Sequence, residues 1–157
     1  MGYLAGVSCG ILTAKMCQLY PKYNACQIVK QFFMFYHLWD FVQVSHAISL
    51  CEPIEHNDMP HIKVWSPNDR TNSHKKVWMH IITPSYPAMN STYNVSKSTY
   101  EVLKREFARG FHLSNSVTYM GIEQWSLLFQ KSTFFMDYKK YIVIKACAPH
   151  IHASEWF

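Results

Sequence analysis

The chain has 157 residues, of which 49% are hydrophobic and 16% aromatic, enough apolar side chain to pack one domain. Its formal net charge of +5, with nine histidines besides, fits an anionic partner but does not require one. No uncharged apolar run reaches about 18 residues, so the pattern argues against a membrane-spanning helix and for a soluble protein. The five cysteines include no C-x-x-C pair, and we expect reduced thiols in an intracellular protein.

Residues 1–20 are predicted to form a helix that ends before Pro21. Its apolar side is formed by Leu4, Val7, Ile11, Leu12 and Leu19. Gly2, Gly6 and Gly10 recur every four residues, and such small residues let a neighbour approach the backbone closely. Tight packing against another helix and close approach of a ligand both explain this face.

A second helix is predicted over residues 24–37, because apolar residues follow a helical period there. These residues are Ala25, Ile28, Val29, Phe32, Phe33 and Tyr36. The short link to the first helix indicates that the two form an antiparallel pair.

From residue 39 to residue 76 the helical period fades, and three prolines mark a long irregular excursion over the surface. Cys51, His56, His61 and His74 lie in it. Their spacing matches no zinc pattern closely, so we interpret them as ordinary loop residues.

The most strongly patterned stretch runs from residue 81 to residue 107 and reads IITPSYPAMNSTYNVSKSTYEVLKREF. Two prolines restrict its backbone, so its first part is predicted to be a rigid loop. The helix that follows has two candidate starts, Asn94 as N-cap or Ser98 with Glu101 as a capping box. We favour Asn94, with the helix ending at Gly110, because glycine commonly follows a helix C-terminus.

A short amphipathic helix is predicted around Trp125 and Leu128. Residues 141–144 form a β-branched run that is typical of a buried strand. Because a lone strand cannot bury its hydrogen-bonding edges, we expect a further domain to begin here and the chain to be cut at both ends. The predicted fold class is mainly α: a helical bundle with a long irregular excursion, followed by the first strand of a truncated α+β domain.

The stretch from residue 81 to residue 107 closely resembles a signature of eukaryotic nuclear poly(A) polymerases. Other segments resemble this family in the same order, namely GYLAGVSCGILTAKMCQLYP, VWSPND, EQWSLLF and FFMDYKKYIVIKACAP. The resemblance covers nearly the whole chain. It implies a helical central domain over residues 1–136 and the beginning of a C-terminal RNA-recognition-motif-like domain over residues 137–157, without the catalytic nucleotidyltransferase domain.

Members of this family transfer AMP from ATP to an RNA 3′ hydroxyl, with two metal ions held by Asp carboxylates. Such ions need carboxylates close together, as in a D-x-D pair. Asp40, Asp58, Asp69 and Asp137 offer no such pair. We therefore expect Mg²⁺ or Mn²⁺ to be bound by the catalytic domain, and we expect this chain alone to be inactive.

The resemblance also implies an ATP contact at Gly6 and Val7, which stand where the family has the glycine–valine pair of a GGV motif. The first glycine of that motif is replaced by Ala5, a mild change that narrows the expected cleft. Absence of a side chain at Gly6 would let a nucleotide approach the backbone.

Lys104, Arg105 and Arg109 are the candidate RNA contacts, since they lie on the central helix with the two arginines one turn apart. A solvated helix face and contact with RNA phosphates both explain these charges. The signature loop likewise has two interpretations: its Asn, Ser and Thr side chains fix the loop to the bundle, or they form part of the cleft wall.

The resemblance thus implies a nuclear polynucleotide adenylyltransferase of mRNA polyadenylation, this portion forming one wall of the ATP/RNA cleft. Its expected partners are an RNA 3′ end, ATP, the N-terminal catalytic domain and mRNA 3′-processing factors, with no membrane. The alternative is a stand-alone, non-catalytic RNA-binding or regulatory module derived from that family.

Overall fold

The computed structural model describes residues 2–52, 62, 64–66, 77–120, 125–131, 133–143 and 145. Five α-helices and one 3₁₀-helix lie in this part: α1 (Gly6–Leu19), α2 (Ala25–Leu38), η1 (Val44–His46), α3 (Lys97–Met120), α4 (Trp125–Leu128) and α5 (Phe134–Asp137). The described residues form no strand, only two isolated β-bridges. The prediction of a mainly helical fold is therefore confirmed for these residues.

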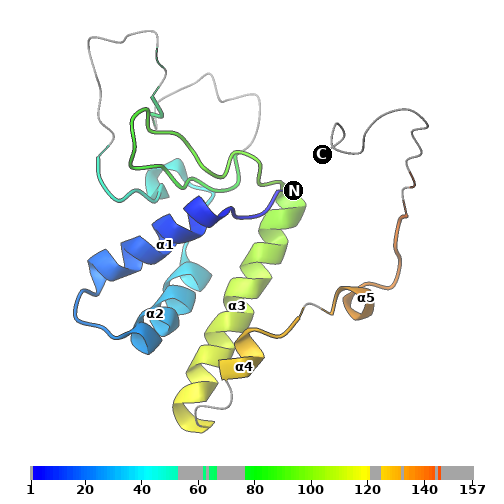
Figure 1. Cartoon of the computed structure of the whole chain (residues 1–157). Helices are drawn as coiled ribbons and strands as arrows, with labels where there is room; N and C mark the ends of the chain where they lie inside the picture. Colours follow the sequence, from blue (N-terminus) through cyan, green and yellow to red (C-terminus); the bar gives the residue numbers. More distant parts are fainter. Residues whose placement is uncertain are drawn as a thin grey trace.

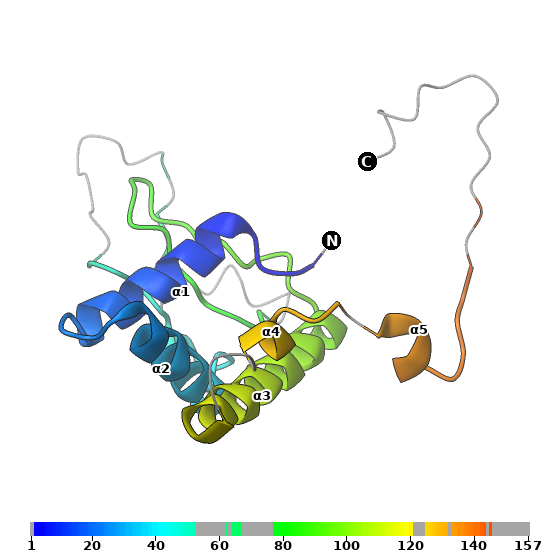
Figure 2. The same ribbon diagram turned by 60° about the horizontal axis from the view of Figure 1, so that its bottom comes forward.

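Helix α2 lies between α1 and α3 and packs against both (Figures 1 and 2). Its start follows from local sequence, because the Asn24 side chain accepts a hydrogen bond from Gln27 N–H and the Gln27 side chain accepts one from Asn24 N–H. The Tyr36 hydroxyl donates to the Leu12 carbonyl at 2.8 Å and ties α2 to α1. The predicted second helix and its return alongside α1 are confirmed.

Helix α1 is shorter than predicted, since it begins at Gly6 and not at residue 1. Gly2 has a φ of +76°, a left-handed conformation that a helix does not contain. The predicted apolar side is wrong for Val7 and Leu19, which are 61% and 46% exposed. The buried side consists of Ser8, Ile11, Leu12 and Met16. Contacts with α2 and the signature loop, and not hydrophobicity alone, decide which side is buried.

Helix α3 starts later and ends later than predicted, at Lys97 and Met120. Ser96 and Thr99 form a reciprocal cap: Ser96 Oγ accepts from Thr99 N–H at 3.3 Å, and Thr99 Oγ1 accepts from Ser96 N–H at 3.0 Å. The predictions of Asn94 as N-cap and of a Ser98 capping box are therefore wrong. Gly110 lies inside the helix, and the tertiary contact described below explains why a glycine occurs there.

The core joins the helices to the loop that precedes α3. Its buried members are Ile11, Leu12, Met16, Tyr36, Phe41, Ile48, Met79, Ile81, Val95, Tyr100 and Phe107. Three aromatic rings lie at its centre, with Phe41 stacked against Tyr36 at 5.7 Å and against Phe107 at 5.8 Å between ring centroids. This contiguous core fixes the geometry of α1 to α3 and of the loop above them.

Part of the predicted excursion is ordered against this core. Ile48 forms a parallel bridge with Ile81, and Cys51 is exposed. His56, His61 and His74 lie outside the described residues, so the interpretation of these histidines remains a prediction. Cys9, Cys17, Cys26 and Cys51 are exposed free thiols, and Cys147 lies outside the described residues.

The C-terminal part differs from the prediction. Helix α4 is present where the short amphipathic helix was predicted, and it packs on α3. The predicted strand is not confirmed, because Tyr141, Ile142 and Val143 carry no β-pairing and are exposed. Residue 144 and most of the predicted domain over residues 137–157 lie outside the described part. Helix α5 lies apart from the α1–α3 bundle in both views (Figures 1 and 2).

None of the described helices combines the length and the hydropathy that a membrane crossing requires.

Candidate nucleotide-facing surface

The first turn of α1 presents two exposed residues beside a buried anchor. Gly6 is the first residue of α1, and within the described part no heavy atom outside its own helix and chain neighbours lies within 4 Å of an ideal Gly6 Cβ. Val7 is exposed, whereas the next residue, Ser8, is fully buried. The Ser8 hydroxyl lies 3.0 Å from the Ser91 hydroxyl, which fixes the first turn of α1 to the signature loop.

Tight helix packing does not explain the glycines of α1 in the described part of the chain. Gly10 has the same open surroundings as Gly6, while Gly2 lies outside the helix. Ala5 at the N-cap provides no side-chain hydrogen bond to the first turn, so the N–H groups there are left to water or to a ligand. The positive end of the helix dipole at this position favours an anion.

Asn90 organises the signature loop. Its amide Oδ1 accepts hydrogen bonds from Ile81 N–H at 3.2 Å and from Thr92 N–H at 3.0 Å. The Thr92 hydroxyl also donates to this oxygen at 2.8 Å, and the Asn90 amide nitrogen donates to Met79 O at 2.9 Å. One side chain thus contacts four groups near the core, and two of these, Met79 O and the Thr92 hydroxyl, also lie within hydrogen-bond distance of each other.

Ser91 adds two hydrogen bonds to this network, because its N–H and its hydroxyl both donate to Ile81 O. Tyr93 does not take part, since its side chain is exposed. Asn90 and Thr92 therefore hold the loop to the segment around Met79 and Ile81, and Ser91 also holds it to α1 through Ser8. The sequence signal that was missed is Ser8, whose position three and four residues before Ile11 and Leu12 places it on the buried side of α1.

The three cations proposed from the sequence have different surroundings. Lys104 is exposed on α3. Arg105 is exposed, and its Nη2 donates to the Tyr138 hydroxyl at 3.3 Å. The hydrogen bond to Tyr138 is the largest cause of a raised pKa of the Arg105 guanidinium, which stays protonated at any physiological pH.

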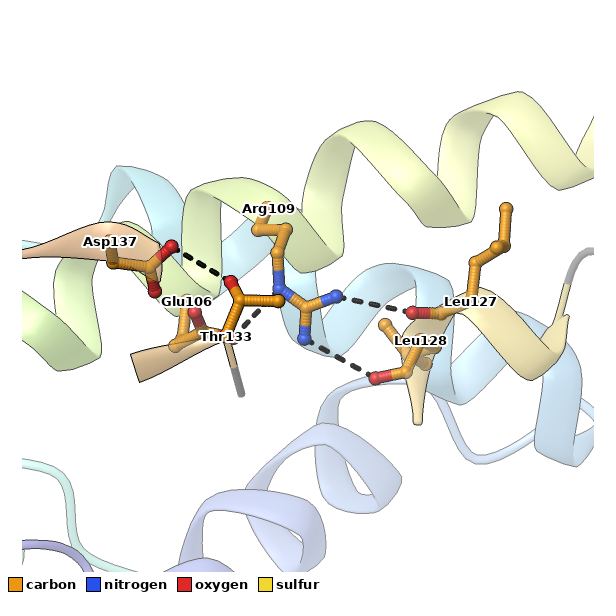
Figure 3. A network of polar contacts seen from close by, with 6 residues as sticks. All are labelled: Glu106, Arg109, Leu127, Leu128, Thr133 and Asp137. Atoms are coloured by element: carbon orange, nitrogen blue, oxygen red, sulfur yellow. Dashed lines mark hydrogen bonds and ion pairs between the residues drawn. The ribbon is translucent and has the colours of Figure 1, made fainter. Parts of the chain in front are cut away.

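Arg109 holds α4 against α3 (Figure 3). Its guanidinium donates to Leu127 O at 3.2 Å and to Leu128 O at 3.3 Å, and these carbonyls belong to the C-terminal end of α4. Its Nε also pairs with Glu106 at 2.8 Å. Arg105 and Arg109 therefore engage different partners, although they lie one turn apart on the same helix.

Of the four aspartates considered for metal binding, Asp40 and Asp137 lie in the described part, and Asp58 and Asp69 lie outside it. Asp137 accepts a hydrogen bond from the Thr133 hydroxyl at 2.8 Å (Figure 3). Within the described part of the chain, no three His, Cys, Asp or Glu side chains come together in a way that would hold a metal ion. These residues do not fit the two-ion site of a nucleotidyltransferase.

Comparisons with known proteins agree on one family. A family model for the poly(A) polymerase central domain matches residues 1–131. A poly(A) polymerase of Dictyostelium discoideum is 42% identical over 144 residues, and a nuclear poly(A) polymerase of Arabidopsis thaliana is 36% identical over 150 residues. A poly(A) polymerase of Schizosaccharomyces pombe is 36% identical over 154 residues.

The chain is covered almost completely by these matches, at 92%, 96% and 98% of its length. It spans only a small part of each relative, namely 17%, 20% and 26% of the three proteins in the same order. The family model and the three relatives show that this chain belongs to the poly(A) polymerase family and corresponds to its central domain.

Proposed function

We propose that this chain is part of a nuclear polynucleotide adenylyltransferase, which transfers AMP from ATP to RNA 3′ ends in mRNA polyadenylation. In this proposal the chain forms one wall of the ATP/RNA cleft. Family membership supports the reaction class, and the name of the Arabidopsis thaliana relative supports a nuclear location. The remaining partners are the catalytic domain and mRNA 3′-processing factors.

The observation that carries this proposal is the open surface at Gly6 and Val7. A nucleotide that lies against this first turn meets backbone at Gly6, the apolar side chain of Val7 and N–H groups without a side-chain cap. These groups suit a ribose or base and a nearby phosphate. Ser8 holds the turn to the signature loop from the buried side, with its hydroxyl 3.0 Å from the Ser91 hydroxyl.

This chain's own contribution is binding and orientation. Mg²⁺ or Mn²⁺, when bound by the catalytic domain, would supply charge stabilisation for the phosphoryl transfer. The described residues offer no cluster of carboxylates for that purpose. We therefore expect the 157-residue chain alone to add no AMP to an oligoadenylate primer. Lys104 and Arg105, whose side chains are exposed on α3, remain our candidates for RNA phosphates.

The test uses the longer protein, with its catalytic domain, that we expect the full-length transcript to encode. Gly6→Val places a branched side chain on the proposed surface, and we expect it to raise the KM for ATP about tenfold or more while the fold is kept. Gly10→Val is the matched control, because Gly10 has equally open surroundings one turn away. Equal KM values in the wild type and Gly6→Val would remove Gly6 from the ATP surface.

The second candidate is a stand-alone, non-catalytic RNA-binding or regulatory module, and the contiguous core of α1 to α3 favours it. Such a module would unfold in one cooperative transition and bind RNA without any adenylation by the full-length product. Adenylation by that product would instead support the enzyme.

A further inference from the structure

The first turn of α1 is a weak start for a helix. Gly6 begins it and Gly10 directly follows it, and glycine is a poor helix former. Ala5 at the N-cap provides no side-chain hydrogen bond. Of residues 6–9, all of which the structure describes, Ser8 alone is buried. The position of this turn therefore depends largely on what holds Ser8.

Two hydroxyls and one carbonyl form a hydrogen-bond relay from α1 into the core. Ser91 Oγ donates to Ile81 O at 2.9 Å, and Ile81 is fully buried. Because a hydroxyl has one hydrogen, Ser91 Oγ is left as the acceptor in its 3.0 Å contact with Ser8 Oγ. Ser8 is then the donor, and Ser91 O, 3.4 Å from Ser8 Oγ, is its more distant second acceptor. The relay runs in one direction, from Ser8 through Ser91 to Ile81 O.

The far end of the relay is fixed without help from Ser8. Ile81 N–H donates to Asn90 Oδ1 at 3.2 Å, and Ser91 N–H donates to Ile81 O at 2.8 Å. Ile81 also forms a parallel bridge with Ile48. The start of α1 lies beside this loop in both views (Figures 1 and 2). Ser8 is therefore the group that joins the first turn of α1 to a site that is already held in place.

We propose that Ser8 and Ser91 are positioning residues for the nucleotide, because their relay sets where the surface at Gly6 and Val7 lies relative to the signature loop. This inference rests on the function proposed above, since ATP is the ligand that is positioned. Ser8 is fully buried while Val7 beside it is exposed, so Ser8 acts through the turn and not by touching ATP. The signature loop thereby contributes to ATP binding through Ser91.

The test measures kcat and the KM for ATP in the longer protein, with its catalytic domain and an oligoadenylate primer. Ser8→Ala removes the donor of the relay, and we expect it to raise the KM for ATP about tenfold while kcat changes less than about twofold. Ser91→Ala should raise the KM only about threefold, because Ser8 then donates to Ser91 O. The double variant should match Ser8→Ala, since the relay is already broken in it.

Two matched variants separate positioning from a loss of stability. Ser91→Thr keeps the hydroxyl and should have the wild-type KM, in contrast to Ser91→Ala. Ser114→Ala removes another buried serine hydroxyl, which donates to Phe111 O within α3, and should leave the KM unchanged. Thermal unfolding shows which variants fold. If Ser8→Ala does not fold, the comparison of Ser91→Ala with Ser91→Thr decides.

Hydrogen exchange of the Cys9 N–H reports on the first turn without ATP. This N–H donates to Ala5 O at 3.1 Å and closes the turn. We expect it to exchange at least about fivefold faster in Ser8→Ala than in the wild type, because the turn opens more often without its anchor. Ser114→Ala should leave its exchange unchanged.

The proposal is overturned if folded Ser8→Ala keeps the wild-type KM, if Ser114→Ala raises the KM equally, or if Ser91→Ala and Ser91→Thr have equal KM values. In these outcomes a raised KM in Gly6→Val would leave the ATP surface itself standing. An unchanged KM in Gly6→Val would instead remove both the surface and its positioning, whatever the exchange of the Cys9 N–H. The two failures are therefore distinguishable.

Discussion

Gly110 lies where α3 crosses α2, and its lack of a side chain is a packing requirement. An ideal Cβ at this position would lie 2.1 Å from Phe33 Cδ1 and 2.3 Å from Phe33 Cε1. Gly6 and Gly10 on α1 have open surroundings instead. The same residue type therefore serves close helix packing in α3 and leaves a bare surface in α1. Sequence spacing alone cannot distinguish these two uses, because they differ in the contact that the glycine makes with another helix.

We expect Gly110→Ala to destabilise the protein by about 1–3 kcal/mol, because the new methyl group forces the Phe33 ring or the α2–α3 crossing to move. Gly10→Ala is the matched control, and it should be neutral or up to about 1 kcal/mol more stable, since alanine favours a helix over glycine. Urea unfolding measures both variants. Phe33→Leu should recover part of the loss in the Gly110→Ala background, and equal stabilities of the two glycine variants would contradict this account of the crossing.

His80 is a buried titratable residue next to the signature loop. Its side chain is 6% exposed, and burial lowers the pKa of its imidazole from the ordinary value of 6.5. The unfolded chain therefore takes up a proton near pH 6.5 that the folded chain does not. Stability from this group is fully present above pH 6.5 and is lost as the pH falls below it.

The free energy of unfolding, measured in urea from pH about 7.5 down to about 5, should fall less steeply for His80→Gln than for the wild type. His112→Gln, which removes an exposed imidazole from α3, is the matched control. Identical pH slopes in His80→Gln and the wild type would show that His80 does not contribute to acid sensitivity.

At the scale of elements, the start of α3 shows where local sequence is ambiguous. Asn94, Ser96 and Ser98 are all residue types that cap helices, and the stretch contains each within five residues. The choice is made by tertiary contacts: Val95 is buried in the core, so the chain enters the helix only after it. Ser96 is then the first residue whose side chain meets the N–H of the residue three positions later.

Ser96→Ala should cost about 1 kcal/mol in the free energy of unfolding, because it removes the acceptor for Thr99 N–H at the helix start. Asn94→Ala should change it by less than about 0.5 kcal/mol, since Asn94 is exposed and precedes the cap. Circular dichroism during urea unfolding measures both. A larger loss in Asn94→Ala than in Ser96→Ala would restore Asn94 as the functional cap.

The contrast between α2 and the C-terminal part shows which elements of the fold can be predicted from local sequence. The bounds of α2 were predictable within a residue, because its period and its Asn24–Gln27 capping box are local. The end of α3 was not predictable, because Gly110 is required for close packing against Phe33 of α2 and does not mark the end of the helix. The run at residues 141–143 has strand composition but no pairing partner in the described part, and composition alone cannot supply one.

The candidate surface was predictable to a similar degree. The resemblance to the family indicated Gly6 and Val7, and both are exposed in the structure. The sequence analysis missed Ser8, the buried neighbour that holds their turn to the signature loop. The three candidate cations looked equivalent in sequence. Their surroundings differ because Arg109 meets the carbonyls of α4, a contact between residues 18 and 19 positions apart in the chain. No local pattern reports such contacts.

At the scale of the whole molecule, stability should reside in residues before the end of α4. Helix α5 has no packing contact with another described helix, and Phe135, Met136, Ile142 and Val143 are all more than four-fifths exposed. An exposed hydrogen bond between Arg105 and Tyr138 connects this segment to α3. An exposed apolar segment of this kind adds little to the free energy of folding and promotes association.

We therefore expect truncation after Lys131, where the family match ends, to change the free energy of unfolding by less than about 1 kcal/mol and to reduce aggregation. Truncation after Met120 is the informative counterpart, because it also removes α4 and leaves Arg109 without the Leu127 and Leu128 carbonyls. It should destabilise the bundle by more than the first truncation does. Urea unfolding and light scattering measure the two effects, and a large loss of stability on truncation after Lys131 would mean that the segment beyond it belongs to the same cooperative unit.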